Sequence, residues 1–253
     1  MTPGRLYLVP APLDFGCAER VALTEVLPAG TIAVAARLAH WVCENAKSTR
    51  AYLKRIGELQ ELAVPVQQQA IAELPREVHK KGDHGPGGFD ARALLQPAQA
   101  GHDMGLVSEA GMPAIADPGS SVVRAAHALG IEVVPLVGPV SLLLALAASG
   151  LNGQNFAFVG YLPQEATART QRIRELEALA LRTGQAQLFI ETPYRNAALW
   201  QALVQGLKPT TRLAVASGLT LPDAVCRSAA VTAWKQQAAP VTNDRPAVFA
   251  LGA

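Results

Sequence analysis

The chain has 253 residues, of which 50% are hydrophobic and 17% are charged, and its formal net charge is +2. This length and apolar content are enough to bury one large core or two smaller ones. The small net charge argues against a constitutive nucleic-acid binder of the strongly basic kind. Aromatic residues make up only 5% of the chain, so no base-stacking platform is predicted.

Cysteine usage and hydropathy predict a cytoplasmic protein without a membrane segment. The three cysteines are far apart and form no CxxC pair, so neither a zinc site nor a disulfide framework is indicated: Cys17, Cys43 and Cys226. The apolar run at the N-terminus is too short for a secretory signal. The longest apolar tract, residues 133–148, contains two prolines and a glycine and is shorter than a membrane span requires.

The first hundred residues predict alternating strands and helices. We expect a buried strand at 5–9, a rigid proline loop at 10–12, a helix at 18–27, a strand at 31–35, a helix at 40–56 and a helix at 89–100. Prolines stand where a dinucleotide-binding fold has its GxGxxG loop, which disfavours a nicotinamide or flavin dinucleotide. The helix at 40–56 is locally basic, which is typical of a solvated face, with contact to a polyanion as the alternative.

Residues 75–88 form the most irregular and polar segment. His79, Asp83 and His84 lie in it, but their spacing matches no metal-ligand motif, so we predict a flexible loop and no metal site. Lys80 and Lys81 stand near glycines, but no predicted strand precedes them as a phosphate-binding loop requires. A mobile loop that covers a substrate is the functional interpretation.

The stretch from 106 to 141 organises the rest of the chain. It predicts a strand, a glycine- and proline-rich loop, a helix with Ser120 or Ser121 as N-cap, a strand at 131–136, a second loop at Gly138-Pro139 and an apolar helix. We expect the two loops to follow neighbouring parallel strands at their carboxyl ends. Open α/β sheets bind ligands at that edge, and Glu109 and Asp117 lie beside the first loop.

The second half continues the alternation after a run of small, turn-forming residues at 149–153. We predict strands at 156–159, 187–190, 212–216 and 247–251, helices at 165–182 and 196–207, and a strand or strand–helix segment at 225–234. The fold class is therefore α/β. The prediction is two α/β domains, residues 1–152 and 153–253.

Several motifs resemble the tetrapyrrole methylase family, a class of S-adenosylmethionine-dependent methyltransferases. They are LVSEAGMPAIADPG, VGPVS, ASGL and FVGYLP, in the family's order and at matching intervals. The chain is most similar to the branch of small-subunit ribosomal-RNA cytidine 2′-O-methyltransferases and their uncharacterised relatives. The resemblance runs from LYLVPAP to the final PAVF, and it implies two α/β domains, a cofactor cleft between them and a homodimer.

The resemblance also implies which residues contact S-adenosylmethionine. They lie in loops or at ends of predicted strands: Pro12, Ala110, Gly111, Met112, Ile115, Val140, Ser141, Glu191, Gly218, Pro246 and Ala247. Small residues suit close backbone approach, and a soft methionine suits an adenine or a thioether. Where the ribosomal branch has EDTR, a short HE-type motif, PGPSA and ESPHR, this chain has ENAKSTR, VHKKGD, VGPVS and ETPYRN. These departures concern the substrate side.

Methyl transfer to a ribose hydroxyl would benefit from a base, whereas a macrocycle carbon would need less help. Glu109, Asp117 and Glu44 are the candidate carboxylates. Their structural alternatives are loop N–H capping for Asp117 and a surface charge for Glu44. We expect a methyltransferase for RNA, involved in rRNA processing. The alternatives are a methyltransferase for a tetrapyrrole or another small metabolite, and a cofactor-binding protein without transferase activity. An RNA acceptor predicts a basic strip, and a macrocycle predicts a deep apolar cleft.

Overall fold

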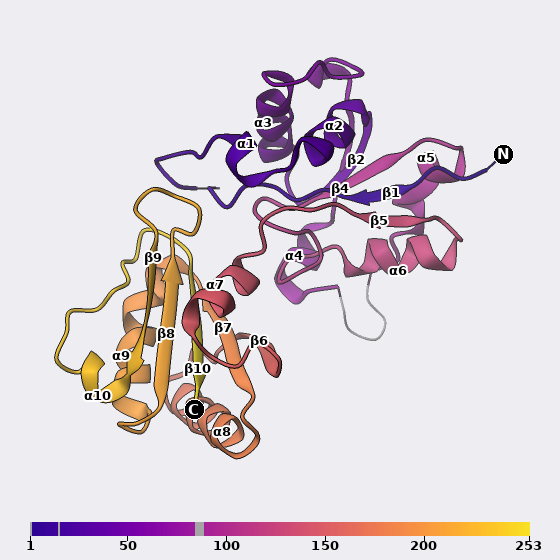
Figure 1. The fold of residues 1–253 in the computed structure, drawn as a ribbon. Helices are drawn as coiled ribbons and strands as arrows, with labels where there is room; N and C mark the ends of the chain where they lie inside the picture. Colours follow the sequence, from indigo (N-terminus) through magenta and orange to yellow (C-terminus); the bar gives the residue numbers. More distant parts are fainter. Residues whose placement is uncertain (1, 15, 84–88) are drawn as a thin grey trace. The chain divides into compact units, whose positions relative to one another are not determined.

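The computed structural model describes residues 2–14, 16–83 and 89–253, without the side chains of residues 79–81, and divides them into two compact units. Unit 1 consists of Val21–Pro139 and the chain before residue 16. Unit 2 consists of Gly16–Arg20 and Val140–Ala253. Each unit has one five-stranded sheet with helices packed on it, so the predicted α/β class is confirmed (Figure 1).

The sheet of unit 1 is entirely parallel, in the order β3-β2-β4-β1-β5. Its strands are β1 (Leu6–Leu8), β2 (His40–Cys43), β3 (Ala70–Glu73), β4 (Met104–Val107) and β5 (Val133–Pro135). All carboxyl ends of a parallel sheet lie at one edge, so the loops that follow these strands meet there. The chain leaves β1 toward β2 but crosses from β4 over β1 to β5. The edge between β1 and β4 is thus a switch point of the topology.

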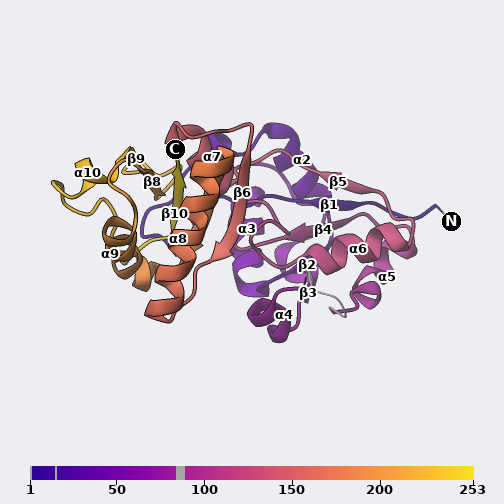
Figure 2. The same cartoon turned by 90° about the horizontal axis from the view of Figure 1, so that it is seen from below.

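Helices cover both faces of this sheet. One face carries α1 (Leu23–Val26), α2 (Ala29–Arg37) and α3 (Ala46–Gly57), and the other α6 (Ser120–Ala128) with η2 (Arg92–Leu95) and α5 (Gln96–Gln99). Two further helices of this unit are η1 (Val66–Gln68) and α4 (Arg76–Lys81). Figure 2 shows α2 and α6 on opposite sides of β1. Alternation along the strands explains the two layers, because Tyr7 and Trp41 pack in one core and Leu6 and Val42 in the other.

Four sequence-based assignments in unit 1 are wrong. Residues 31–35 lie in α2, where buried Thr31, Ile32, Ala35 and Ala36 follow a helical spacing that their β-branched members obscured. The helix expected at 40–56 splits into β2 and α3 at Asn45, whose side chain accepts hydrogen bonds from the first helical N–H groups. The helices expected at 18–27 and 89–100 shrink to short turns, and β3 had no sequence prediction.

The sheet of unit 2 is mixed, in the order β6-β7-β10-β8-β9. Its strands are β6 (Phe156–Tyr161), β7 (Ala186–Glu191), β8 (Arg212–Ser217), β9 (Val225–Ala230) and β10 (Ala247–Gly252). Only the β6–β7 pair is parallel, and the other pairs are antiparallel. These strands agree with the sequence prediction to within about two residues.

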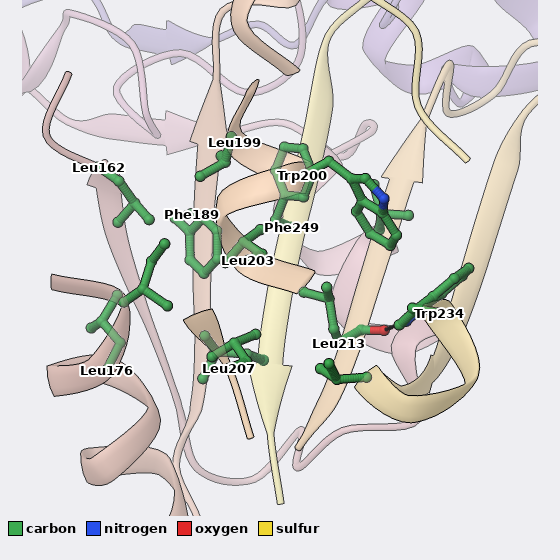
Figure 3. Close-up of a cluster of buried hydrophobic side chains, with 14 of the residues drawn as sticks. Leu162, Leu176, Phe189, Leu199, Trp200, Leu203, Leu207, Leu213, Trp234 and Phe249 are labelled. Carbon is green, nitrogen blue, oxygen red and sulfur yellow. Dashed lines mark hydrogen bonds between the residues drawn. The ribbon is translucent and has the colours of Figure 1, made fainter. Parts of the chain in front are cut away.

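The core of unit 2 lies between this sheet and α8 (Ala166–Thr183), α9 (Asn196–Gly206) and α10 (Val231–Trp234). Figure 3 shows Phe189 and Phe249 from neighbouring strands facing α9. Trp200 meets Trp234 edge to face, with ring centroids 4.9 Å apart. The Trp234 indole N–H donates to the carbonyl of Leu213 at 2.8 Å, so this buried polar group is satisfied.

The opposite face of the unit 2 sheet is covered by α7 (Ser141–Ser149). Its residues Leu142, Ala145 and Leu146 pack on alanines and valines of β8 and β10. The contacts therefore group residues 140–152 with unit 2, whereas the predicted boundary followed residue 152. Among the helices of the described residues, none is long and apolar enough to cross a membrane.

Candidate functional site

The loops after β1 and β4 are joined backbone to backbone at the carboxyl edge of the unit 1 sheet. The Ala11 N–H donates to the Gly111 carbonyl at 2.9 Å, and the Gly111 N–H donates back to Ala11 at 3.0 Å. Gly111 has φ +71°, which suits a glycine. The predicted cofactor residue Pro12 follows this bridge directly, and Ala110 and Met112 flank Gly111. The structure thus brings these predicted residues together.

The loop after β5 packs on the same edge. A Cβ added to Gly138 would lie 2.3 Å from Cγ of Pro10, so only a glycine fits against this proline. The Tyr52 hydroxyl donates to the Pro10 carbonyl at 2.9 Å, and Thr31 Oγ1 donates to the Val137 carbonyl at 2.7 Å. The two glycine–proline loops were expected after neighbouring strands. That expectation is wrong, because β1 lies between β4 and β5.

Three carboxylates converge at this edge, and they are the three that the sequence nominated. Glu44 follows β2 directly, and its Oε2 accepts a hydrogen bond from the Glu109 N–H at 3.0 Å. Ser48, in the first turn of α3, donates to Oε1 of Glu109 at 3.3 Å. Burial, with the nearby negative charges of Glu44 and Glu109, raises the pKa of Asp117 to about 7. Near neutral pH, Asp117 therefore exchanges a proton readily.

The structural role considered for Asp117, capping loop N–H groups, belongs to Asp83 instead. Asp83 Oδ2 accepts hydrogen bonds from the N–H groups of Gly119 and Ser121, at 2.9 and 2.8 Å, and from Ser121 Oγ at 2.7 Å. Although burial alone would raise it, these hydrogen bonds hold the pKa of Asp83 below its ordinary value. Neither Ser120 nor Ser121 caps α6 by its side chain, because Gly119 is the N-cap. Sequence reasoning missed this anchor.

The loop between Glu109 and Asp117 holds an unusual backbone. Ala114 and Ala116 both have φ +64°, a left-handed conformation that costs a non-glycine residue about 1 kcal/mol or more. Ile115 between them is 43% exposed, so an apolar side chain faces solvent. Strain of this kind clusters at binding and catalytic sites.

In unit 2, the predicted residues also lie at one edge of the sheet. Ala247, at the start of β10, is paired with Glu191 at the end of β7 and with Ser217 at the end of β8. Ser217 Oγ donates to the carbonyl of Pro246 at 3.0 Å. Gly218 follows with φ +61°, and a Cβ there would lie 2.9 Å from Arg245 Nη1. Val140 and Ser141 are the N-cap and first residue of α7.

Glu191 is buried and fully compensated. Its Oε1 accepts hydrogen bonds from Arg195 Nη2 and Nε at 2.6 and 3.0 Å, and from the N–H and hydroxyl of Thr192 at 2.7 and 3.1 Å. Only 2% of its side chain is exposed. The pair stabilises the turn that leads from β7 into α9, through η3 (Pro193–Arg195).

No group of three metal-ligating side chains occurs among the residues that the structure describes. His84 and the side chains of His79, Lys80 and Lys81 lie outside the described residues. The sequence interpretation of residues 75–88 therefore stays a prediction, except that residues 76–81 form helix α4.

A family model of tetrapyrrole (corrin/porphyrin) methylases matches residues 29–232, which is most of the chain. The chain belongs to this family. A ribosomal RNA small subunit methyltransferase I of Mesorhizobium japonicum is 31% identical over 215 residues, 85% of this chain and 63% of that protein. The protein of the same name from Pseudomonas aeruginosa is 40% identical over 102 residues. The chain thus spans less than two thirds of the length of these relatives.

Two solved structures share the fold. The methyltransferase CobJ aligns with a TM-score of 0.57 and 16% identity, covering 98% of this chain and 94% of CobJ. The uroporphyrin-III-C-methyltransferase of Thermus thermophilus aligns with a TM-score of 0.52 and 17% identity, covering 98% of this chain and 92% of that one. Both likenesses concern the fold alone, and they cover nearly the whole chain.

Proposed function

We propose that this protein is an S-adenosylmethionine-dependent methyltransferase that modifies a ribose hydroxyl of small-subunit ribosomal RNA. The observation that carries the proposal is the convergence of Glu44, Glu109 and Asp117 at the switch point of the unit 1 sheet. A hydroxyl acceptor must lose a proton during methyl transfer, and this site holds a carboxylate with the base strength for that step. The similarity to relatives named as ribosomal RNA methyltransferases supports the acceptor.

The residues at this edge fit an adenosine-based thioether or sulfonium. Ala110 and Ala114 are small and only partly buried, and exposed Ile115 and Val137 offer apolar contact on either side of β1. The prolines exclude the phosphate cradle of a dinucleotide, which this cofactor does not need. Pro12, Met112 and the predicted residues of unit 2, Glu191 among them, are also proposed to contact the cofactor.

Bound S-adenosylmethionine would supply an electrophilic methyl group. The chain's own contribution would be to position the acceptor and to take up its proton at a carboxylate oxygen of Asp117. Glu109 and Glu44 would keep that carboxylate basic through their negative charge, and Ser48 and the bond between Glu109 N–H and Glu44 would hold them in place. We also propose that the enzyme acts in the cytoplasm as a homodimer.

The test begins with cofactor binding, measured by calorimetric titration with S-adenosylmethionine and S-adenosylhomocysteine. We expect micromolar binding that Gly111→Trp abolishes. Gly130→Trp is the matched control, because Gly130 also has positive φ, has nothing near its Cβ position, and ends α6 away from the site. Equal loss in both variants, or no binding by the folded wild type, would contradict the cofactor assignment.

The second step transfers labelled methyl groups to small ribosomal subunits that lack the modification. Transfer to the ribose of one nucleotide would support the proposal. Transfer only to a tetrapyrrole would replace the RNA acceptor by the small-molecule alternative. Cofactor binding without transfer to either acceptor would instead indicate a binding protein that has lost the chemistry.

A further inference from the structure

Helix α3 starts at the candidate site and carries a row of positive charges away from it. Asn45 caps the helix directly after Glu44, and Ser48 in its first turn contacts Glu109. The N–H of Ala46 donates to Oε1 of Glu73 at the end of β3, at 2.6 Å. The first turn of α3 is therefore fixed to the loops that hold the carboxylates, so the direction of the helix relative to them is set by hydrogen bonds inside unit 1.

Lys47, Arg50 and Lys54 form one stripe on the exposed side of this helix. At 3.6 residues per turn, their positions fall within an arc of about 60°. All three are exposed, whereas Tyr52 and Leu53 face the core. The stripe is about 10 Å long, at roughly 1.5 Å per residue. That length matches about three nucleotides along the axis of a stacked strand, at roughly 3.4 Å each.

The charges of the stripe are available to a partner. Within the described residues, none of the three side chains is paired with a carboxylate. Arg55 of the same helix differs, because its Nη1 and Nη2 each lie 3.0 Å from an oxygen of the buried Asp14. Arg55 of α3 thus binds a buried carboxylate, whereas the three cations of the stripe are exposed to solvent.

The carboxylates at the site and the phosphates of an RNA acceptor carry charge of the same sign. The negative charges of Glu44 and Glu109 that act on Asp117 also act on an RNA acceptor, which carries a negative charge on every nucleotide. The cluster alone would repel that acceptor. Cations that begin at Lys47, three residues beyond Glu44, offset the repulsion next to the site.

We propose that the stripe of Lys47, Arg50 and Lys54 binds the phosphate backbone of the RNA strand whose nucleotide enters the carboxylate site. The inference rests on the proposed function and deepens it by naming the surface that holds the acceptor. Contacts of this kind position the strand and give no sequence preference, so selection of the nucleotide belongs to other residues. Neutralising the stripe should weaken the binding of all RNA sequences alike.

The test compares two triple variants with the same change of charge. The stripe variant is Lys47→Gln with Arg50→Gln and Lys54→Gln. The control variant is Arg182→Gln with Lys208→Gln and Lys235→Gln, three exposed cations of unit 2. RNA affinity is measured by fluorescence anisotropy from 50 to 300 mM KCl, together with cofactor affinity and the KM and kcat of methyl transfer.

For the stripe variant, we expect RNA binding about tenfold to a hundredfold weaker, with the slope of log affinity against log salt about 2 units shallower. The KM for RNA should rise, while cofactor affinity and kcat stay near the wild-type values. The control variant should keep the wild-type slope. If the two variants have equal slopes while the wild-type protein methylates RNA, the proposed role of the stripe is overturned and the proposed function stays intact. A wild type that neither binds nor methylates RNA would overturn both.

Discussion

The two units differ in the charged neighbours of the acidic side chains at the ends of their strands. In unit 1, Glu44, Glu109 and Asp117 are held near one another, and burial with mutual repulsion raises the pKa of Asp117. In unit 2, Glu191 is more deeply buried than these three, but Arg195 pairs with it at 2.6 Å. Unit 1 holds several carboxyl groups close together, and unit 2 pairs its buried carboxylate with a cation.

The difference indicates where the chemistry lies. A buried charge that loses its partner costs stability, whereas like charges held close together raise the pKa of a carboxyl group toward neutral pH. The strand arrangement agrees with this division, because the parallel sheet of unit 1 brings the loops after all five strands to one edge, while the mostly antiparallel sheet of unit 2 distributes its connections between both edges.

Removing the compensating cation of unit 2 should be the most damaging change. Arg195→Ala leaves Glu191 buried and unpaired, and we expect the free energy of unfolding to fall by about 3–5 kcal/mol, measured by urea denaturation. Arg92→Ala in unit 1 is the control, because its ion pair with Asp90 is exposed and the denaturation midpoint should not move. If the two variants behave alike, Glu191 does not depend on Arg195.

Neutralising the carboxyl group of unit 1 should have the opposite sign at high pH. Because the pKa of Asp117 is raised from 3.8 to about 7, the folded state binds the proton more tightly, and wild-type stability should fall as the pH rises from about 4 to about 7. Asp117→Asn should be more stable than the wild type at pH 8, by up to roughly 3–4 kcal/mol, and similar to it near pH 4.

The control for this prediction is Glu109→Gln, which removes one of the two negative neighbours of Asp117. Its stability should decline over a lower pH range than that of the wild type, because the remaining repulsion is smaller. Parallel stability curves for wild type and Asp117→Asn between pH 4 and 8 would show that Asp117 titrates at an ordinary value, and the contrast between the units would be lost.

A smaller effect concerns the packing of the loop after β5 in unit 1. Gly138→Ala places a Cβ 2.3 Å from Pro10, and we expect a loss of about 1–3 kcal/mol together with weaker cofactor binding. Gly153→Ala in unit 2 meets no atom within 4 Å and should leave both quantities unchanged. Thermal melting and calorimetric titration measure them. Normal cofactor affinity in Gly138→Ala would show that this loop does not contribute to the binding site.

The smallest expected effect comes from the strained loop itself. Ala116→Gly relieves a left-handed alanine but adds freedom to the unfolded chain, so the net gain in stability should stay within about 1 kcal/mol. Ala128→Gly, in the last turn of α6, should instead destabilise by about 0.5–1 kcal/mol. A loss of stability in Ala116→Gly would mean that the loop stores no strain there.

The sequence predicted much of the fold because local signals agree with it. Apolar strands with glycine or proline after them, such as the buried Met104–Val107 and the partly exposed Val133–Pro135, can be recognised without tertiary information. The errors at 31–35 and 40–56 arose where β-branched residues lie in a helix and where a four-residue strand runs directly into one. Burial decided both, and burial depends on partners distant in the chain.

The candidate site was predicted residue by residue but not as an arrangement. Glu44 and Glu109 are 65 residues apart, and their contact depends on the pairing of β2 with β4, which no local pattern encodes. Asp83 was considered with two histidines as a metal group, whereas its carboxylate anchors the start of α6. The one sequence signal that an N–H anchor would be needed was Pro118-Gly119, directly before α6.

If Asp117 takes up the proton of the methyl acceptor, the rate of methyl transfer must follow the ionisation of Asp117 as the pH changes. With RNA and cofactor saturating, the wild-type rate should rise with pH and level off above about 7, as Asp117 ionises. Asp117→Asn should lose about a hundredfold or more of that rate and the rise with pH, while it keeps cofactor and RNA affinity. A variant that retains the wild-type rate and pH profile would contradict the account.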